Sequence, residues 1–254
     1  MIQKKMTILL IIGILLFIAS LSLGVVFNAL AVWNDLEGMS FWGHPEGSSF
    51  DSSIEAGGTI TRLNCPVLLT SRDLGKVTAT IKNPKDTQSK TWIQASISKP
   101  GEPDNLIRNR QELMLEPAES VSISWQVDKS NKLFDRVIYV RVFLFQTQYH
   151  PPSATKHCGI IIKDIGKLSG NQAIALITGT SLLGMALGTL LWWWGSSAQM
   201  RLTNRIVKIM ISLIGITVLT TLTNLAGWML FAGILFILMI LLLVSIFEAI
   251  LLNK

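Results

Sequence analysis

Residues 209–247, IMISLIGITVLTTLTNLAGWMLFAGILFILMILLLVSIF, form a stretch of 39 residues without a charged side chain. A single helix of this length would extend roughly 58 Å, which is nearly twice the hydrocarbon thickness of a bilayer. The stretch therefore has to reverse. Asn224-Leu225-Ala226-Gly227 is the expected turn, because Asn and Gly accept turn conformations. We expect transmembrane helices over 204–223 and 228–250.

Two other uncharged stretches predict two further transmembrane helices. The first has 29 residues between Lys5 and Asp35, and its apolar part exceeds the roughly 7–15 residues of a signal-peptide core. We therefore expect a retained transmembrane helix within residues 1–33, although Ala29-Leu30-Ala31 has the small residues of a cleavage site. The second stretch lies between Lys167 and Arg201 and predicts a helix over 172–195.

Charged residues are concentrated between the first two predicted helices. The whole chain is 50% hydrophobic and 15% charged, with a mean hydropathy of +0.48, whereas soluble domains carry about a quarter charged residues. Residues 34–171 contain 31 of the 38 charged side chains, and their net charge is only +1. A wholly soluble, disordered or collagen-like protein is thereby excluded, and we expect a membrane protein with one water-soluble insert.

The residues beside the predicted helices set an orientation. Cations accumulate on the cytoplasmic side of membrane proteins, and a four-helix arrangement places six together: Lys4, Lys5, Arg201, Arg205, Lys208 and Lys254. We expect a multi-pass protein of the plasma (inner) membrane, with both termini cytoplasmic and residues 34–171 extracellular or periplasmic. Tryptophans are typical of membrane interfaces, with Trp33 and Trp228 expected outside and Trp192, Trp193 and Trp194 inside. Most of the net charge of +6 belongs to the cytoplasmic side, which argues against a nucleic-acid partner.

The insert has the pattern of a β-domain. Residues 34–57 are polar and glycine-rich, without a helix or strand period, and predict a linker. Within 58–166, apolar residues alternate with polar ones, most clearly at Val121, Ile123 and Trp125, so that each strand buries one face. The nearly continuous apolar run 137–145 instead predicts a central strand covered on both sides. Seven strands are expected, near 58–66, 75–82, 91–98, 106–115, 120–127, 137–146 and 156–163.

This strand count indicates an antiparallel sandwich. The segment 113–125, LMLEPAESVSISW, resembles the strand, proline turn and strand of fibronectin-like and bacterial adhesion-type immunoglobulin-like domains. The resemblance covers roughly a hundred residues and implies a fold, not an activity. The predicted fold class is α+β: four transmembrane helices, with an all-β, immunoglobulin-like extracytoplasmic domain between the first two. Trp92 or Trp125 is expected to fill its core.

Both cysteines of the chain, Cys65 and Cys158, lie in the insert. A disulfide between the first and last strands is the natural interpretation in an oxidising compartment, and free thiols are the alternative. Such a bond would tie the two ends of the domain together and stabilise it by about 4–5 kcal/mol.

Catalytic, cofactor and metal sites are not expected. His150, His157 and Cys158 raise the question of a copper site of the cupredoxin kind, but Cys158 is not followed by histidine and methionine. Adjacent strand residues also point to opposite faces. His44 is expected in a solvated loop. No nucleophile elbow, phosphate loop, Rossmann glycine pattern or His-Glu-x-x-His motif is present, so we do not expect an enzyme.

Small and polar residues within the predicted membrane helices indicate helix packing. Gly184 and Gly188 are spaced for close helix approach, and a polar stripe follows the third helix, with Thr217, Thr220, Thr221 and Asn224 at i, i+3, i+4 and i+7. A transport pathway is the alternative. It is disfavoured because Glu248 is the only acidic residue in the helices, and we expect it to be hydrated or paired near the cytoplasmic interface.

These features predict a non-catalytic accessory, scaffold or assembly subunit of a larger membrane complex, in contact with membrane lipids and other membrane-protein subunits. A permease-like or mechanotransmitting subunit of an ABC-type system is the alternative, since the order helix, outside domain and three helices resembles the macrolide-exporter and cell-division permeases. A claudin-like barrier protein ranks lower, because the insert is longer and the Trp…Cys…Cys signature is missing. An enzyme ranks last.

Overall fold

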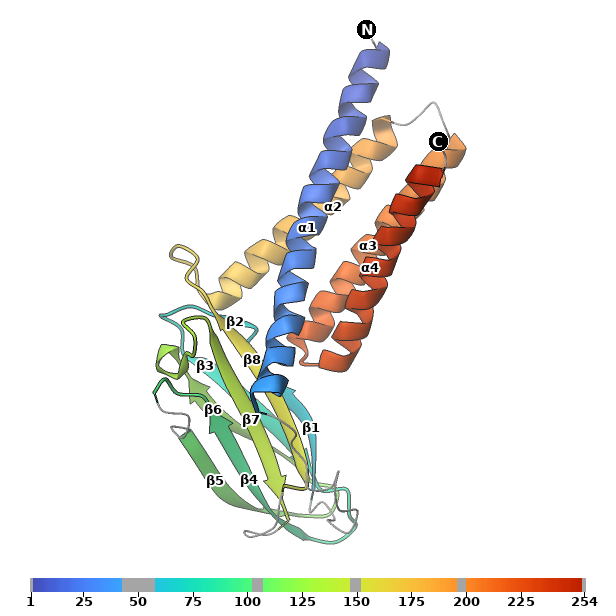
Figure 1. The fold of residues 1–254 in the computed structure, drawn as a ribbon. Coiled ribbons are helices and arrows are strands. Elements are labelled where there is room, and N and C mark those ends of the chain that lie inside the picture. Colours follow the sequence, from blue (N-terminus) through green and yellow to red (C-terminus); the bar gives the residue numbers. More distant parts are fainter. Residues whose placement is uncertain (1, 43–57, 102–106, 147–151, 196–199, 253–254) are drawn as a thin grey trace. The chain divides into compact units, whose positions relative to one another are not determined.

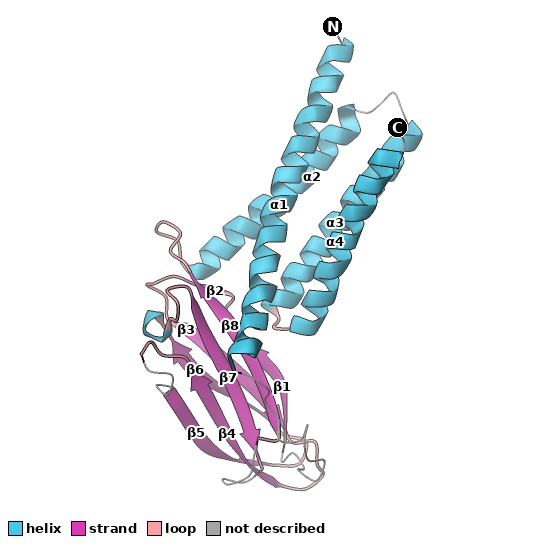
Figure 2. Ribbon diagram, in the orientation of Figure 1, coloured by secondary structure: helices cyan, strands magenta, loops and turns pink. Residues whose placement is uncertain are grey.

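The computed structural model describes residues 2–42, 58–101, 107–146, 152–195 and 200–252 (Figure 1). In these residues the protein is α+β, with four α-helices and two β-sheets (Figure 2). The chain divides into two compact units. One, the helical unit, comprises Met1–Val32 and Gln172–Lys254, and the other, the β unit, comprises Trp33–Asn171.

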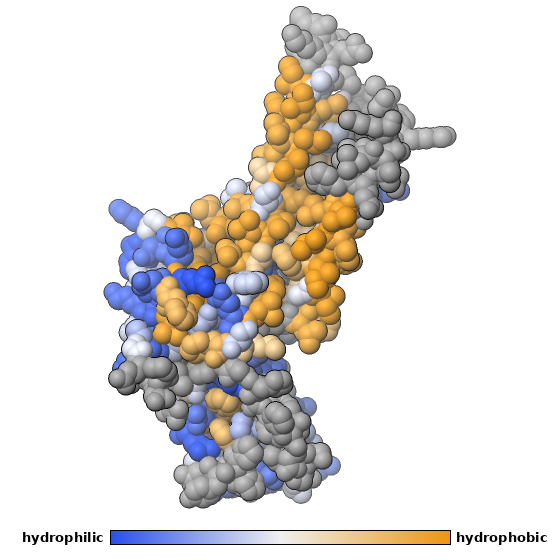
Figure 3. All heavy atoms as spheres, viewed as in Figure 1, coloured by the Kyte–Doolittle hydropathy of each residue, from blue (hydrophilic) through white to orange (hydrophobic). Residues whose placement is uncertain are grey.

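The helices are α1 (Ile2–Trp42), α2 (Gly170–Gly195), α3 (Met200–Leu225) and α4 (Met229–Leu252). The expected reversal lies between α3 and α4, where Gly227 adopts a φ of 72°, a conformation that favours glycine. Three helices contain runs long and apolar enough to cross a membrane: Thr7–Phe41, Gly170–Gly195 and Val207–Leu225. The apolar run described in α4, Leu230–Val244, is shorter. Apolar side chains dominate the visible surface of the helices (Figure 3).

The β unit contains an antiparallel three-stranded sheet in the order β1-β3-β6 and a five-stranded sheet in the order β2-β8-β7-β4-β5. Strands lie at all seven predicted positions. The eighth, β2, has two residues, which is too short for any sequence period, and pairs parallel with β8. The strand bounds are β1 Thr59–Asn64, β2 Leu68–Leu69, β3 Gly75–Lys82, β4 Ser89–Ile97, β5 Ile107–Leu115, β6 Ser120–Val127, β7 Val137–Phe145 and β8 Ala154–Ile162.

Side chains from both sheets form one hydrophobic core. Val77 and Ile81 of β3 belong to it together with Ile93 of β4 and Leu144 of β7, and all four are fully buried. Of the two tryptophans predicted as candidates for the core, Trp125 lies in it. Trp92 lies on the outer face of the five-stranded sheet, because its strand position alternates with the buried ones. The period-two pattern of the sequence therefore identifies the core correctly.

Helix α1 continues beyond its predicted end. The prediction of a linker is wrong for residues 34–42, which are helical, while residues 43–57 lie outside the described part of the chain. The extension packs on the outer face of β7 and β8. Phe41 stacks on Tyr139 with ring centroids 4.9 Å apart, and a side chain at Gly159 would collide with the carbonyl oxygen of Asn34. Strand β7 is thus buried on both faces, as its continuous apolar sequence predicts.

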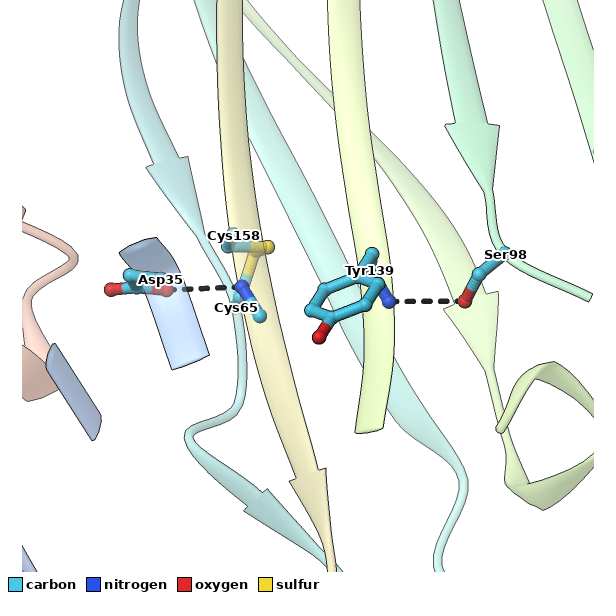
Figure 4. Close-up of a disulfide and its surroundings, with 6 residues drawn as sticks. Asp35, Cys65, Ser98, Tyr139 and Cys158 are labelled. Atoms are coloured by element: carbon cyan, nitrogen blue, oxygen red, sulfur yellow. Dashed lines mark hydrogen bonds between the residues drawn. A yellow bond between two sulfur atoms is a disulfide. The ribbon is translucent and has the colours of Figure 1, made fainter. Parts of the chain in front are cut away.

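The predicted disulfide is confirmed. Cys65, directly after β1, is bonded to Cys158 of β8 across a sequence separation of 93 residues (Figure 4). In the chain-entropy model, a loop of this length stabilises the folded state by about 4–5 kcal/mol. Cys158 points into the core, so the bond links the segment after β1 to the five-stranded sheet from the inside.

Asp73, in the connection between β2 and β3, joins two segments that are distant in sequence. Its Oδ2 accepts hydrogen bonds from the backbone N–H groups of Thr70 (2.8 Å) and Gly170 (2.7 Å), the first residue of α2. Burial alone would raise the pKa of Asp73, but these hydrogen bonds outweigh it, so the pKa lies below its ordinary value of 3.8.

The Asp73→Ala variant should lower the free energy of unfolding by about 1 kcal/mol at pH 7, because Gly170 loses the acceptor at the start of α2. Since the folded-state pKa lies below 3.8, the carboxylate stabilises the fold above about pH 4 and loses this effect as the pH falls through the lowered pKa. Urea unfolding followed by circular dichroism at pH 7 and below pH 4 measures both. The exposed Asp86→Ala variant is the control. A deficit of Asp73→Ala that is independent of pH contradicts the assignment.

Candidate functional site

A buried polar cluster in the helical unit centres on Asn28 of α1. The Asn28 Nδ2 donates to the carbonyl oxygen of Gly24 (3.0 Å) and to Oγ1 of Thr221 (3.1 Å), and its Oδ1 accepts from Nδ2 of Asn224 (2.8 Å). Asn28 is fully buried. Since its donors and acceptor are all used, this Asn28 cluster, made of Asn28, Thr221 and Asn224, can join α1 to α3 without an unsatisfied polar group.

Two members of the predicted polar stripe thus reach α1. The other two donate to carbonyl oxygens of α3, and Thr217 also donates to Sδ of Met239 in α4 (3.6 Å). Thr217 donates to the carbonyl oxygen of Leu213 and Thr220 to that of Ile216, each at 2.8 Å. Both are buried. Asn28 was missed by the sequence analysis, because a lone asparagine in an apolar run of α1 carries no sign of its partners on α3.

Gly184 and Gly188 lie against α1. A Cβ at Gly188 would come within 2.7 Å of the carbonyl oxygen of Gly13, and one at Gly184 would collide with the side chain of Ser20. Ser181, one turn earlier, donates to the carbonyl oxygen of Ser20 (2.7 Å). Small residues on both helices therefore permit close backbone approach between α1 and α2. The matching small residues of α1 were not singled out from the sequence.

The cavity that adjoins the cluster is small. It is lined by Gly24 and Phe27 of α1, Ser181 of α2 and Thr217 of α3, among others, and its surface is mainly apolar. Its size corresponds to about one water molecule. It is therefore a packing gap and not a passage for a solute.

The five tryptophans predicted at membrane interfaces divide into two groups. Trp33, Trp193, Trp194 and Trp228 are exposed, whereas Trp192 is half-buried and packs against the core of the helical unit. Trp33 also donates from Nε1 to Oε1 of Glu37 (2.7 Å). Exposure suits an interfacial position for four of them, but their depth in a bilayer stays a prediction.

Acidic side chains near the end of α1 hold the β unit together. Glu37 accepts hydrogen bonds from the hydroxyl of Tyr139 (2.8 Å) and from Arg136 (2.8 Å), with which it forms an ion pair. Asp35 accepts one from the backbone N–H of Gly159 (3.0 Å; Figure 4). Burial and the bond to Glu37 raise the pKa of Tyr139 to about 12, so this phenol stays protonated and donates at all physiological pH values.

His157 and Cys158 lie on opposite faces of β8. Cys158 is in the core, whereas His157 is half-buried on the outer face, opposite Arg141 of β7. Burial, with the nearby charge of Arg141, lowers the pKa of His157. His44 and His150 lie outside the described residues. In the part of the chain that the structure describes, no three His, Cys, Asp or Glu residues lie close enough to hold a metal ion.

The outer face of the five-stranded sheet carries a group of aromatic and cationic side chains. The guanidinium of Arg110 lies 4.2 Å from the ring centroid of Phe145 and 6.0 Å from that of Trp92. The guanidinium of Arg141 lies 4.6 Å from that of Phe143. We call the group the aromatic–guanidinium face and define it as Lys90, Trp92, Arg110, Arg141, Phe143 and Phe145. Its members come from three strands, so no sequence motif signals it.

No protein-family model and no curated protein matches this chain. Among solved structures, the CARDB domain of a Pyrococcus furiosus protein, in complex with di-metal ions, is 10% identical over 42% of this chain and 87% of that domain, with a TM-score of 0.33. A cycloisomaltooligosaccharide glucanotransferase of Paenibacillus sp. is 11% identical over 44% of this chain but only 15% of its own length, with a TM-score of 0.35. The DNA glycosylase AlkC of Pseudomonas fluorescens is 10% identical over 43% and 31%, with a TM-score of 0.32. None of these matches assigns a family or an activity to this chain.

The Asn28 cluster predicts energetic coupling between α1 and α3. Asn28→Ala should lower stability in detergent micelles by about 1–2 kcal/mol, because Asn224 loses its acceptor in a buried setting. In a double-mutant cycle, Asn28→Ala and Asn224→Ala should couple by about 0.6 kcal/mol or more. Thermal unfolding of the full chain measures both. Thr223→Ala, which removes a hydroxyl bonded only within α3, is the matched control, and strict additivity in the cycle would refute the coupling.

Proposed function

We propose that this chain is a non-catalytic integral membrane protein that serves as an accessory, scaffold or assembly subunit of a larger membrane complex. In this proposal four helices span the plasma (inner) membrane, both termini are cytoplasmic, and the β unit is an immunoglobulin-like domain presented outside. The two sheets with one shared core support the immunoglobulin-like assignment. The six flanking cations and the disulfide support the sidedness.

The observation that carries the proposal is a stripe of exposed apolar side chains on α4. The exposed large residues of α4 include Phe231, Leu238 and Ile240. Among the others, five that are each at least half exposed recur at the three- and four-residue spacing of a helix-packing seam: Leu230, Ile234, Ile237, Leu241 and Val244. Met239 and Ala232, by contrast, are fully buried. A seam of this regularity suits another transmembrane helix, because association in lipid depends on close packing of side chains.

A second line of support is that acid groups of the β unit are engaged in structural bonds. Glu37 and Asp73 each accept hydrogen bonds that fix one segment on another, and the pKa of each lies below its ordinary value. Asp128 caps the short 3-10 helix Lys129–Asn131, and Asp164 accepts from the backbone N–H of Ser71. Carboxylates bound in this way are poorly placed to accept or deliver protons to a substrate.

Cysteine labelling tests the topology. Because both native cysteines are joined in the disulfide, a single added cysteine is the only thiol. In intact cells a membrane-impermeant maleimide should label Leu74→Cys, at an exposed position of the β unit, and should label Lys208→Cys only after permeabilisation. Leu74→Cys in permeabilised cells is the control for reactivity. The opposite pattern would overturn the proposed sidedness.

Photo-crosslinking in native membranes tests the subunit role. A photoreactive amino acid in place of Ile237, on the exposed stripe, should give one discrete protein adduct, whereas the same group in place of the buried Met239 should not. Purification in mild detergent should recover the adduct partner with the unmodified chain. Reaction of position 237 with lipid alone, together with a monodisperse lone chain, contradicts the proposal. An ATPase as the adduct would favour the permease-like alternative.

A further inference from the structure

Arg110 is held in place by aromatic rings and not by a carboxylate. Its guanidinium lies over Phe145 and beside Trp92, and its Nε is buried without a hydrogen-bond partner. Among the ion pairs of the described residues none includes Arg110. A guanidinium whose flat face rests on a ring keeps its N–H fork in a fixed plane, which is the geometry that binds a carboxylate through two hydrogen bonds.

The aromatic–guanidinium face carries excess positive charge. Lys90, Arg110 and Arg141 are its cations, and Glu112, the acidic residue opposite Trp92 in the register, is already paired with Lys90 at 2.7 Å. The rings of Phe143 and Phe145 are covered by the two guanidinium groups. These rings are therefore not free to stack on a sugar. Since Arg141 is buried and Lys90 is paired with Glu112, Arg110 is the cationic donor that this face offers to a ligand. The charge of the face favours an anionic ligand.

The same sheet face already binds carboxylates from within the chain. Glu37 of α1 accepts hydrogen bonds from Tyr139 and Arg136, and Asp35 accepts one from Gly159, all at one end of β7 and β8. Helix α1 supplies these two acids to its own end of the face. At the other end, around Arg110, the acid that the described residues supply is Glu112, which is paired with Lys90.

An open strand edge adjoins the cations. Strand β5 ends the five-stranded sheet and pairs with β4 along its whole length, and within the described residues no strand pairs with its other edge. Such an edge can accept an extended peptide through backbone hydrogen bonds. Alternate side chains of an added strand would project on the outer face and lie about 5 Å from those of β5. The edge of β6 in the other sheet offers serines instead of cations.

We propose that β5 and the aromatic–guanidinium face bind an extended acidic segment of a partner polypeptide, added to the sheet edge with glutamate or aspartate side chains directed at Arg110. The proposal rests on the proposed function in one respect, that this chain has a protein partner, and it names the chemistry of the partner segment. Arg110 serves as the main anion contact. Trp92 and Phe145 orient its guanidinium.

Titration of the purified full chain in micelles with a ten-residue peptide of alternating Glu and Val tests the proposal. The peptide should bind, and binding should weaken at least about fivefold in Arg110→Gln and similarly when salt is raised from about 50 to 300 mM. Hydrogen exchange should show protection of the amides of β5 on binding. Arg62→Gln, which removes an exposed cation from β1 of the other sheet, is the matched control and should bind as the unaltered chain does.

Three results would overturn the proposal: equal binding of an alternating Lys and Val peptide, unchanged affinity of Arg110→Gln, or protection outside β5. Tighter binding of an oligouronate without protection of β5 would also overturn it, in favour of a glycan ligand. Arg110→Lys retains the charge and removes the planar fork, so a loss comparable to Arg110→Gln shows that the fork matters. The titration uses a synthetic peptide and does not involve α4. A failed titration therefore contradicts only the acidic-segment proposal, and a failed crosslinking experiment contradicts only the proposed subunit role.

Discussion

The packing of residues 34–41 of α1 on the outer face of β7 and β8 is the interaction on which the β unit depends. Gly159 has no side chain, and its position permits the backbone of Asn34 to approach the strand. The approach leaves the N–H of Gly159 without a water partner, and Asp35 replaces it. Glu37 likewise accepts a hydrogen bond from the hydroxyl of Tyr139. Because the helix covers this end of the sheet, β7 can be apolar on both faces, and the disulfide at Cys158 lies directly beneath a protected surface.

In the helical unit, too, buried polar groups need hydrogen-bond partners within the protein. In an apolar environment each polar group needs a partner within the protein. Thr217 and Thr221 of α3 donate to carbonyl oxygens one turn earlier in their own helix, and Asn28 is matched by Thr221 and Asn224. Glycines at positions 13, 184 and 188 let α1 and α2 approach closely. Polar residues in this unit therefore act as packing elements, and their hydrogen bonds restrict which helix faces can meet.

The strands, the core tryptophan and the disulfide were predictable because each depends on a local pattern or on a pair of rare residues. Alternation at Val121, Ile123 and Trp125 has one physical interpretation, and two cysteines allow one pairing. The extension of α1 was not predictable, since Asn34, Asp35 and Gly38 favour turns in isolation and are helical here because of tertiary contacts. The Asn28 cluster and the aromatic–guanidinium face were not predictable either. Their members lie on separate helices or strands, and only the packing of the helices and the register of the strands bring them together.

The strand period also separates core residues from outer-face residues within single strands. In β8, Cys158 belongs to the core, whereas His157 and Gly159 lie on the outer face. In β4, Ile93 and Ala95 are fully buried, whereas the preceding residue, Trp92, faces outward. Where α1 does not cover the sheet, substitutions on the outer face therefore leave the packing of the core almost unchanged, whereas a side chain at Gly159 would collide with Asn34. Alternate residues of β4, β5 and β7 on the outer face beyond α1 are thus separate from the core, the disulfide and the contact with α1, which maintain the fold.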